Sequence, residues 1–150
     1  MKTRFKIMAA LALAGLAASA HARFKPEDAI LYRQGIMKAH RWNLVPIALM
    51  VQGKMPYDQA VLVTKALRLN ALSSMTADGF VAGSESGAPT KARPEIWSNA
   101  AGFKQAADAF AAETPKLVAA AQSGNMDQIK AAFGPVVKSC DNCHDNFRSK

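Results

Sequence analysis

The chain has 150 residues, half of them hydrophobic, and its 19 Lys and Arg against 11 Asp and Glu give a net charge of +8. This length suits a single domain, since domains usually have about 100 to 200 residues. The basic residues are scattered and do not alternate with aromatic ones, which argues against a nucleic-acid site and leaves at most a weak attraction to acidic partners.

Residues 1–22 have the layout of a secretory signal peptide. Lys2, Arg4 and Lys6 form a basic start, an apolar run over 7–18 follows, and Ala20-His21-Ala22 is a small-x-small cleavage pattern. The apolar run is too short to span a membrane, and no stop-transfer segment follows it. We therefore expect an exported mature domain over 23–150, with 16 Lys and Arg against 11 Asp and Glu and no membrane insertion.

The mature sequence has almost no β-strand pattern, and its apolar residues recur at steps of three and four, which predicts helices. The first predicted helix begins at Pro26-Glu27-Asp28 and runs to about Gln52, before Gly53. Pro46 lies inside it and predicts a kink. The expected inner face of this helix carries Ile30, Gln34, Met37, Leu44, Ala48 and Val51.

Three more helices are expected downstream. The second runs from Pro56 to about Ala77, and a loop rich in Gly, Ser and Pro then covers 78–93, which predicts a flexible or functional segment. The third runs from Pro94 to Ser123, with Pro115 inside it, and the fourth covers about 126–147. Four amphipathic helices with mostly short links predict an all-α, antiparallel four-helix bundle.

The last predicted helix contains Cys140-Asp141-Asn142-Cys143-His144, the C-x-x-C-H pattern at which c-type haem is attached. Positions i, i+3 and i+4 share one helical face. Two thiols at this spacing form thioethers with the haem vinyl groups, and the adjacent imidazole reaches the iron from the same side. We therefore predict one covalent haem c per chain, held through Cys140 and Cys143, with His144 as the axial iron ligand.

Other roles for the two cysteines fit less well. A thioredoxin-like redox pair belongs near a βαβ unit at the start of a helix, whereas this pair comes late in a helix of an all-α chain. A structural zinc site needs four ligands, and only His40 remains in the mature chain to complete the set. A disulfide that closes so small a loop adds little stability and gives His144 no role.

The other side of the iron needs either a second ligand or an open position. Met37 lies on the expected inner face of the first helix, where it can bind the iron and make a low-spin electron carrier. Alternatively Met37 only packs over the iron, because methionine fills irregular gaps, and the five-coordinate iron then admits a small gas. His40 falls off this face, so we expect it at the surface rather than on the iron.

Polar residues near Met37 and His144 are further candidates for haem contacts. Gln34 interrupts the apolar face and Arg33 flanks it, and haem propionates would supply partners for both. The alternative is that Arg33 is solvated and Gln34 only borders the core. Arg148 lies four residues after His144 on the same face, where it can lie beside the haem. The alternative is that Arg148 only interacts with the helix dipole, as a cation near a helix C-terminus usually does.

Over nearly the whole mature sequence the chain resembles cytochrome c′, a family of class II c-type cytochromes. The matching segments lie at the openings of the first and third helices and in the last helix: Lys25-Pro26-Glu27-Asp28-Ala29, Tyr32-Arg33-Gln34, Arg93-Pro94-Glu95-Ile96-Trp97-Ser98, Ala131-Ala132-Phe133-Gly134 and Cys143-His144-Asp145. The resemblance implies a homodimer in the periplasm, with a five-coordinate, largely high-spin haem that binds nitric oxide and carbon monoxide.

The resemblance also implies particular haem contacts. In the family, residues that match Arg33 and Gln34 touch the haem, as do two residues in the loop before the third helix, which by position are Thr90 and Lys91. Relatives commonly have an acid at the second of these positions, so Lys91 is a departure. Arg148 matches a basic residue near the proximal face of the haem.

The position that faces the open side of the iron maps to Met37 and varies in the family. We therefore expect a gas-binding protein that is also capable of one-electron transfer with an unidentified redox partner. The alternative is a low-spin electron carrier of the c-556 type, because related low-spin members use a methionine of the first helix as a ligand. An enzyme ranks last, since we expect no acid–base residue over the iron.

Overall fold

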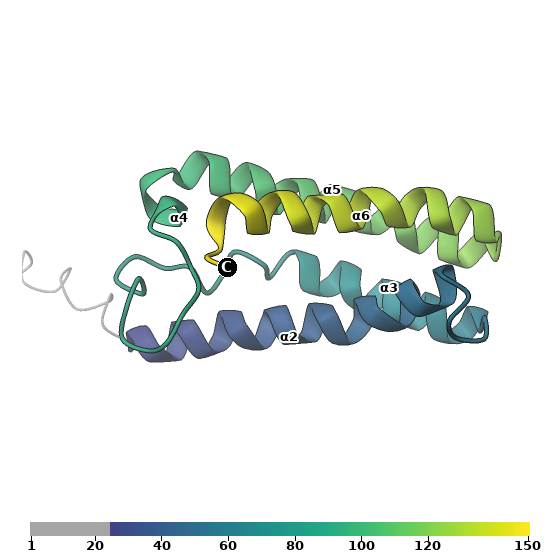
Figure 1. Ribbon diagram of the computed structural model, residues 1–150, viewed down its shortest axis with the longest axis horizontal. Coiled ribbons are helices and arrows are strands. Elements are labelled where there is room, and N and C mark those ends of the chain that lie inside the picture. Colours follow the sequence, from purple (N-terminus) through teal and green to yellow (C-terminus); the bar gives the residue numbers. More distant parts are fainter. Residues whose placement is uncertain (1–24) are drawn as a thin grey trace, which may run out of the picture.

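The computed structural model describes residues 25–150, so the predicted signal peptide and its cleavage site lie outside the described residues. Its helices are α2 (Pro26–Val51), α3 (Gln59–Ser73), α4 (Glu95–Ser98), α5 (Ala100–Ser123) and α6 (Met126–Phe147). Figure 1 shows α2 and α3 as one antiparallel pair and α5 and α6 as another, packed side by side. The predicted all-α four-helix bundle is confirmed. No helix within residues 25–150 is long and apolar enough to cross a membrane.

Local signals in the sequence set where the long helices begin. Proline at the first position and two acids in the first turn open α2. The side chains of Asp58, Asn99 and Asn125 each accept a hydrogen bond from a backbone N–H group in the first turn of α3, α5 and α6 respectively. These caps satisfy donors that have no partner within the helix, so each start is fixed locally.

Two predicted helices differ from the structure at their ends. The third is not continuous from Pro94 to Ser123, because Asn99 leaves the helical conformation (φ −123°, ψ 56°) and caps α5, which separates the short α4. The second helix ends at Ser73 rather than near Ala77, since the chain then enters successive turns. Pro46 lies inside α2 without ending it.

The buried face of α2 also differs from the predicted face. The residues that the bundle buries lie mainly one position earlier: Ala29, Ile30, Arg33, Ile36, His40, Asn43, Ile47 and Met50. Apart from Ile30, the predicted residues flank this face and are half-buried. Three of the buried positions are polar. The prediction used the spacing of apolar residues alone, so it placed the inner face of α2 about one residue away from the face that is buried.

The core consists of two hydrophobic clusters at different levels of the bundle. The larger one draws on all four long helices and includes Ile47, Leu69, Phe110 and Val136. The smaller one contains Ile96, Phe103 and Phe147, with Phe80 and Trp97 packed against it. Cys140 packs against the larger cluster and Cys143 against the smaller one, so the cysteine motif lies where the two clusters meet.

Candidate functional site

A cavity of about 280 Å³ lies beside the last turns of α6, at the end of the bundle that carries the long loop. All of the predicted site residues except Cys140 line it, together with Lys38, Thr76, Phe80, Ala92, Ile96, Phe103 and Phe147. Aromatic rings close the side towards the smaller core cluster, with Phe103 packed edge-on against Phe80 (4.8 Å between ring centroids) and Phe147 (5.4 Å). The result is an apolar slot whose rim is cationic.

Both cysteines are half-buried and free, one helical turn apart on α6. Burial raises the pKa of Cys140 to about 11, with Asp141 and Cys143 contributing, and burial also raises the pKa of Cys143. Both thiols are therefore protonated at neutral pH. A thioredoxin-like redox pair needs the opposite, a thiol whose pKa is lowered.

The imidazole of His144 follows directly after Cys143 and lines the same cavity. Burial lowers the pKa of His144, and the positive charge of Arg148 lowers it further, while Asp141 and Asp145 act against this. The ring is consequently neutral near pH 7, which is the form that binds a metal. Arg148 lines the cavity from the end of α6, where it remains exposed.

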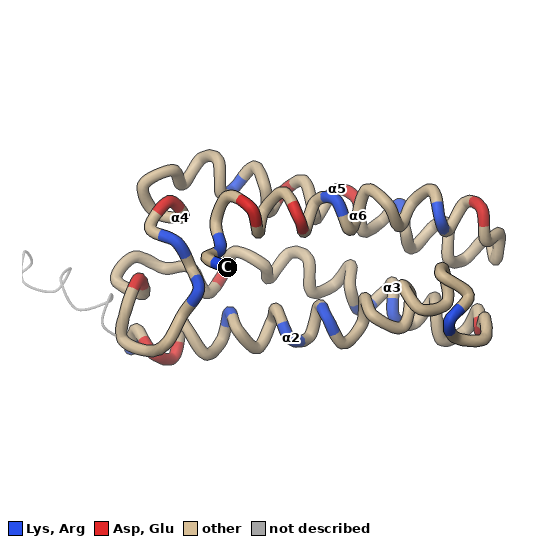
Figure 2. Tube along the Cα trace, viewed as in Figure 1, with Lys and Arg blue, Asp and Glu red and all other residues tan. Residues whose placement is uncertain are grey.

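Met37 lines the cavity from α2, whereas His144 lines it from α6. The cavity therefore has a thioether sulfur on one helix and an imidazole on another. Lys38 and Lys91 are exposed at the rim, and the lining includes cations but no Asp or Glu. Figure 2 shows Lys and Arg distributed along the helices, with a group at the end of the bundle where the C-terminus lies. This environment suits a large apolar ligand that carries carboxylates.

Arg33 is buried and fixes the long loop to α2. Its guanidinium group donates hydrogen bonds to Gly79 O (3.1 Å), to Ser84 Oγ (2.8 Å) and O (2.9 Å), and to Thr90 Oγ1 (3.1 Å). It also lies over the ring of Phe80, 4.9 Å from the centroid. The interpretation of Arg33 as a solvated side chain is therefore wrong. The predicted propionate contact would have to use Nε–H, because the other four N–H groups of Arg33 bond to the loop.

The segment before α4 is held from two directions. Gln34 Nε2 donates to Pro89 O (2.8 Å), and Thr90 Oγ1 accepts from Ala92 N (3.1 Å). On the other side, Ala92 and Arg148 form an isolated β-bridge that joins the loop to the end of α6. Thr90 and Lys91 are thereby placed at the cavity, which no local pattern in the sequence determines.

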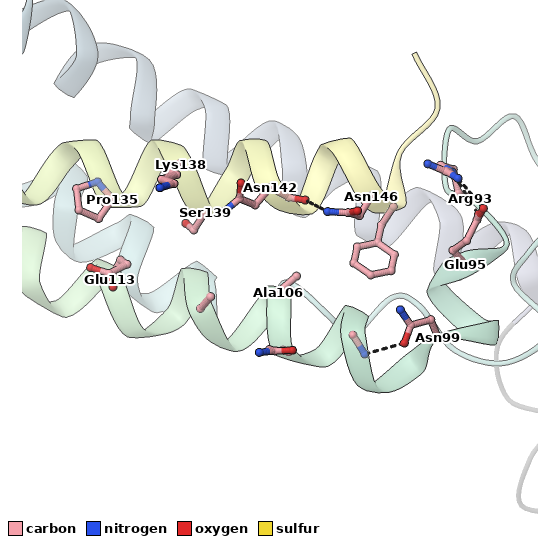
Figure 3. Close-up of a pocket in the computed structure, with 14 residues that line it drawn as sticks. Arg93, Glu95, Asn99, Ala106, Glu113, Pro135, Lys138, Ser139, Asn142 and Asn146 are labelled. Carbon is pink, nitrogen blue, oxygen red and sulfur yellow. Dashed lines mark hydrogen bonds and ion pairs between the residues drawn. The ribbon is translucent and has the colours of Figure 1, made fainter.

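A larger cavity, of about 610 Å³, lies on the outer side of α5 and α6 (Figure 3). Nine of its 14 lining residues are polar or charged, among them Glu113, Lys138 and Asn142, and none is a cysteine. Size therefore does not identify the site, whereas the cysteine motif and the apolar slot do.

Comparison with known proteins gives the family of this chain. The family model described as Cytochrome C′ matches residues 28–148. The chain belongs to the cytochrome c′ family. Curated relatives include cytochrome c′ of Rubrivivax gelatinosus (43% identical, covering 84% of this chain and 98% of that protein) and cytochrome c-556 of Rhodopseudomonas palustris (30% identical, covering 90% and 92%).

Solved cytochrome c′ structures share the fold. Cytochrome c prime from Shewanella frigidimarina is 38% identical and covers 85% of this chain and 100% of that one, with a TM-score of 0.81. A nitric oxide complex of a variant from Alcaligenes xylosoxidans is 43% identical and covers 85% and 99%, with a TM-score of 0.78. A carbon monoxide-bound variant from the same organism has a TM-score of 0.77 at 43% identity, covering 84% and 98%.

Haem c is therefore the cofactor, and the residues of the cytochrome c′ slot fit it. Two half-buried thiols at i and i+3 lie where covalent attachment needs them. Thr76 lines the slot with a buried hydroxyl oxygen that has no hydrogen-bond partner within residues 25–150, as expected of an atom that meets a bound group.

The predicted surface position of His40 is wrong. The side chain is only 9% exposed and lies in the buried face of α2. The error follows from the shift in the face of α2, since His40 falls off the predicted stripe but on the observed one.

Several lining residues were missed in the sequence. Phe103 and Phe147 could have been found, because both lie on apolar stripes that face the bundle core. Phe80 and Thr76 had no such signal, since they follow α3 in successive turns. Phe80 is placed there by contacts with Arg33 and with Trp97 of α4.

Proposed function

We propose that the protein is a periplasmic gas-binding cytochrome c′ with a five-coordinate haem. Cys140 and Cys143 would hold the haem through thioethers, and His144 would bind the iron. The observation that carries the proposal is the slot between α2 and α6, with Met37 on one wall and His144 on the other. A covalent haem supplies an iron atom whose remaining position can take a diatomic gas.

The walls of the slot suit small, neutral ligands. Phe80, Phe103 and Ile96 contribute apolar surface, and Met37 adds a flexible, half-buried side chain. Nitric oxide and carbon monoxide need no charged partner at the iron. The nitric oxide and carbon monoxide complexes of relatives at 43% identity support the same ligands here.

The rim of the slot fits the haem propionates. Arg33 Nε–H, Gln34, Lys91 and Arg148 are the candidate donors, and cations interact favourably with carboxylates. Gln34 already donates one amide hydrogen to Pro89 O, so only its second amide hydrogen is free to bind a propionate. Lys91 keeps the charge balance of the rim positive.

The alternative is a low-spin electron carrier with Met37 as the sixth ligand. Two observations favour keeping it: Met37 lines the slot opposite His144, and the c-556 relative covers 90% of this chain. In both alternatives the haem can exchange one electron with a redox partner.

The absorption spectrum of the reduced holoprotein tests the proposal. We expect high-spin bands that shift on addition of carbon monoxide. Sharp low-spin bands that do not change under carbon monoxide would exclude the gas-binding function in favour of the alternative.

Replacing Met37 with Ala gives a second test. If Met37 only covers the iron, carbon monoxide should associate faster while the resting spectrum barely changes. If Met37 is a ligand, the spectrum of the variant should change from low spin to high spin. Met55→Ala is the matched control, because Met55 packs against the larger core cluster and does not line the slot.

We further propose that the protein is a homodimer joined through α2 and α3. These helices expose large apolar side chains: Leu31 (61%), Trp42 (73%), Val45 (42%), Val61 (38%) and Leu67 (47%). Exposed apolar groups of this size on neighbouring helices are typical of protein interfaces.

A further inference from the structure

Exposed cations lie at the opening of the slot. Lys38 from α2, Lys91 from the long loop and Arg148 from the end of α6 all line the slot, and all three are exposed. We call these three side chains the cationic rim. The buried Arg33 adds a fourth positive charge, and no Asp or Glu lines the slot. Neutral gases such as carbon monoxide need none of this charge.

The backbone of the long loop fixes the rim relative to the bundle. Ala92 and Arg148 form an isolated β-bridge, and Ser149 N donates a hydrogen bond to Lys91 O (2.9 Å). Paired extended segments lie about 4.8 Å apart, so Lys91 and the end of α6 are close neighbours. Arg33 bonds the preceding residue of the loop to α2. The loop therefore places Lys91 between α2 and α6, beside the slot.

A bound haem would neutralise only part of this charge. Four cations line the slot, whereas a haem brings two propionates, so two positive charges remain in excess. Glu95 is paired with Arg93. Further acids act electrostatically on slot residues from outside the lining: Glu85, Asp141 and Asp145. The excess positive charge is therefore concentrated at the opening itself.

An electron passes efficiently between two centres only when they are close, so a redox partner must approach the haem at this opening. Charge complementarity orients such encounters and speeds them. We propose that the cationic rim is the docking surface for an acidic redox protein. In the complex the ferrous iron loses one electron and the one-electron centre of the partner gains it, while no bond forms or breaks and no proton moves. This inference rests on the haem of the proposed function and names the class of its redox partner.

An acidic protein suits the rim better than an anionic membrane does. Peripheral binding to a membrane combines cations with apolar side chains that enter the interface. Within residues 25–150, none of the exposed large apolar side chains lines the slot. The rim thus offers charge without an apolar anchor, as the polar edge of a contact between proteins does.

The test measures how fast the ferrous holoprotein is oxidised by hexacyanoferrate(III), a trianion, at low ionic strength. Lys38→Gln/Lys91→Gln removes two charges from the rim. The matched control, Lys54→Gln/Lys130→Gln, removes two exposed charges at the other end of the bundle, where Lys130 lies about 21 Å before His144 along α6. Oxidation of the rim variant should slow by about tenfold, and the control should change far less. About 0.5 M salt should remove most of the difference, because it screens exposed charges.

Further reagents keep the test decisive. Tris(phenanthroline)cobalt(III), a cationic oxidant, should react with the rim variant at least as fast as with the unmodified protein. Slowing with both oxidants would overturn the proposal, because the variant would then alter the driving force or the access to the haem. Polyglutamate, which models an acidic protein face, should compete with hexacyanoferrate(III) in the unmodified protein and the control, but much less in the rim variant. Absence of this competition, or equal protection by phosphatidylglycerol vesicles, would overturn the choice of an acidic protein.

The remaining outcomes separate this inference from the proposed function. Equal slowing of the rim variant and the control would overturn the docking surface, since net charge alone would then act. No slowing of the rim variant would do the same, whether or not the protein binds carbon monoxide. If the unmodified protein takes up no carbon monoxide while the rim variant slows as expected, the gas site fails and the docking surface stands, because the low-spin alternative also exchanges an electron. A chain without covalent haem would refute both.

Discussion

Replacing Arg33 with Met removes the anchor of the long loop while preserving an unbranched stem that favours helix. Arg33 is 3% exposed, and all four of its hydrogen bonds end on residues of the segment 79–90. Without it, the carbonyl oxygens of Gly79 and Ser84 lose their donor in a buried place. The loop that completes the haem slot should therefore loosen from α2.

The magnitude follows from opposing effects. Each net hydrogen bond contributes about 1 kcal/mol, so four of them set an upper value of about 4 kcal/mol. Thr90 is half-buried and can turn to water instead. Burial also lowers the pKa of Arg33, because removing its charge from water costs free energy. The Met variant avoids this cost, which offsets part of the lost stability. We therefore expect a loss of about 2 to 3 kcal/mol in the free energy of unfolding.

Urea unfolding of the holoprotein, followed by far-ultraviolet circular dichroism, measures this loss. With a slope of about 1 to 3 kcal/mol per M, the midpoint should fall by about 1 to 2 M. Limited proteolysis should cut the variant within 78–93 faster than the unmodified protein. The control is Arg41→Met, since Arg41 is exposed on the same helix. A midpoint for Arg33→Met no lower than that of the control would refute the reasoning.

Four other substitutions test separate features of the structure. A Cβ atom on Gly79 would lie 2.9 Å from the Tyr32 ring, so Gly79→Ala should lower the free energy of unfolding by about 1 to 3 kcal/mol. Gly134→Ala meets nothing within 4 Å inside a helix and should raise it by about 0.5 to 1 kcal/mol; equal urea midpoints for the two variants would contradict the close approach. Because burial lowers the pKa of His40, the unfolded chain binds its proton first, and stability should fall as pH drops below about 6.5. Unfolding midpoints of His40→Leu should fall less steeply between pH 7 and 5, and parallel curves would count against a buried neutral ring. Trp42→Glu, at a side chain that is 73% exposed, should shift the protein from dimer to monomer in analytical ultracentrifugation with an unchanged haem spectrum. A variant that sediments as the unmodified protein does would place the interface elsewhere.

The four long helices were predictable because their signals are local. Apolar residues at steps of three and four, proline at the start of α2, and the capping residues before α3 and α6 act within a few positions of each other. The cysteine motif is equally local, since attachment of a haem needs two thiols and an imidazole on one face of a single helix. The sequence by itself therefore determined the bundle, the haem and the helix that carries it.

Only the tertiary structure decided which polar residues are buried near the slot and which residues line it. Arg33 and His40 are polar residues at buried positions of α2, and their burial depends on the loop and on α5 rather than on their neighbours in the chain. Thr76, Phe80 and Thr90 reach the slot through contacts between segments more than 40 residues apart, such as those from Arg33 to Ser84 and Thr90. The periodicity of apolar residues shows which side chains avoid water, but it carries no information about such polar partners. The slot residues outside α6 could therefore be identified only from the packing of the tertiary structure.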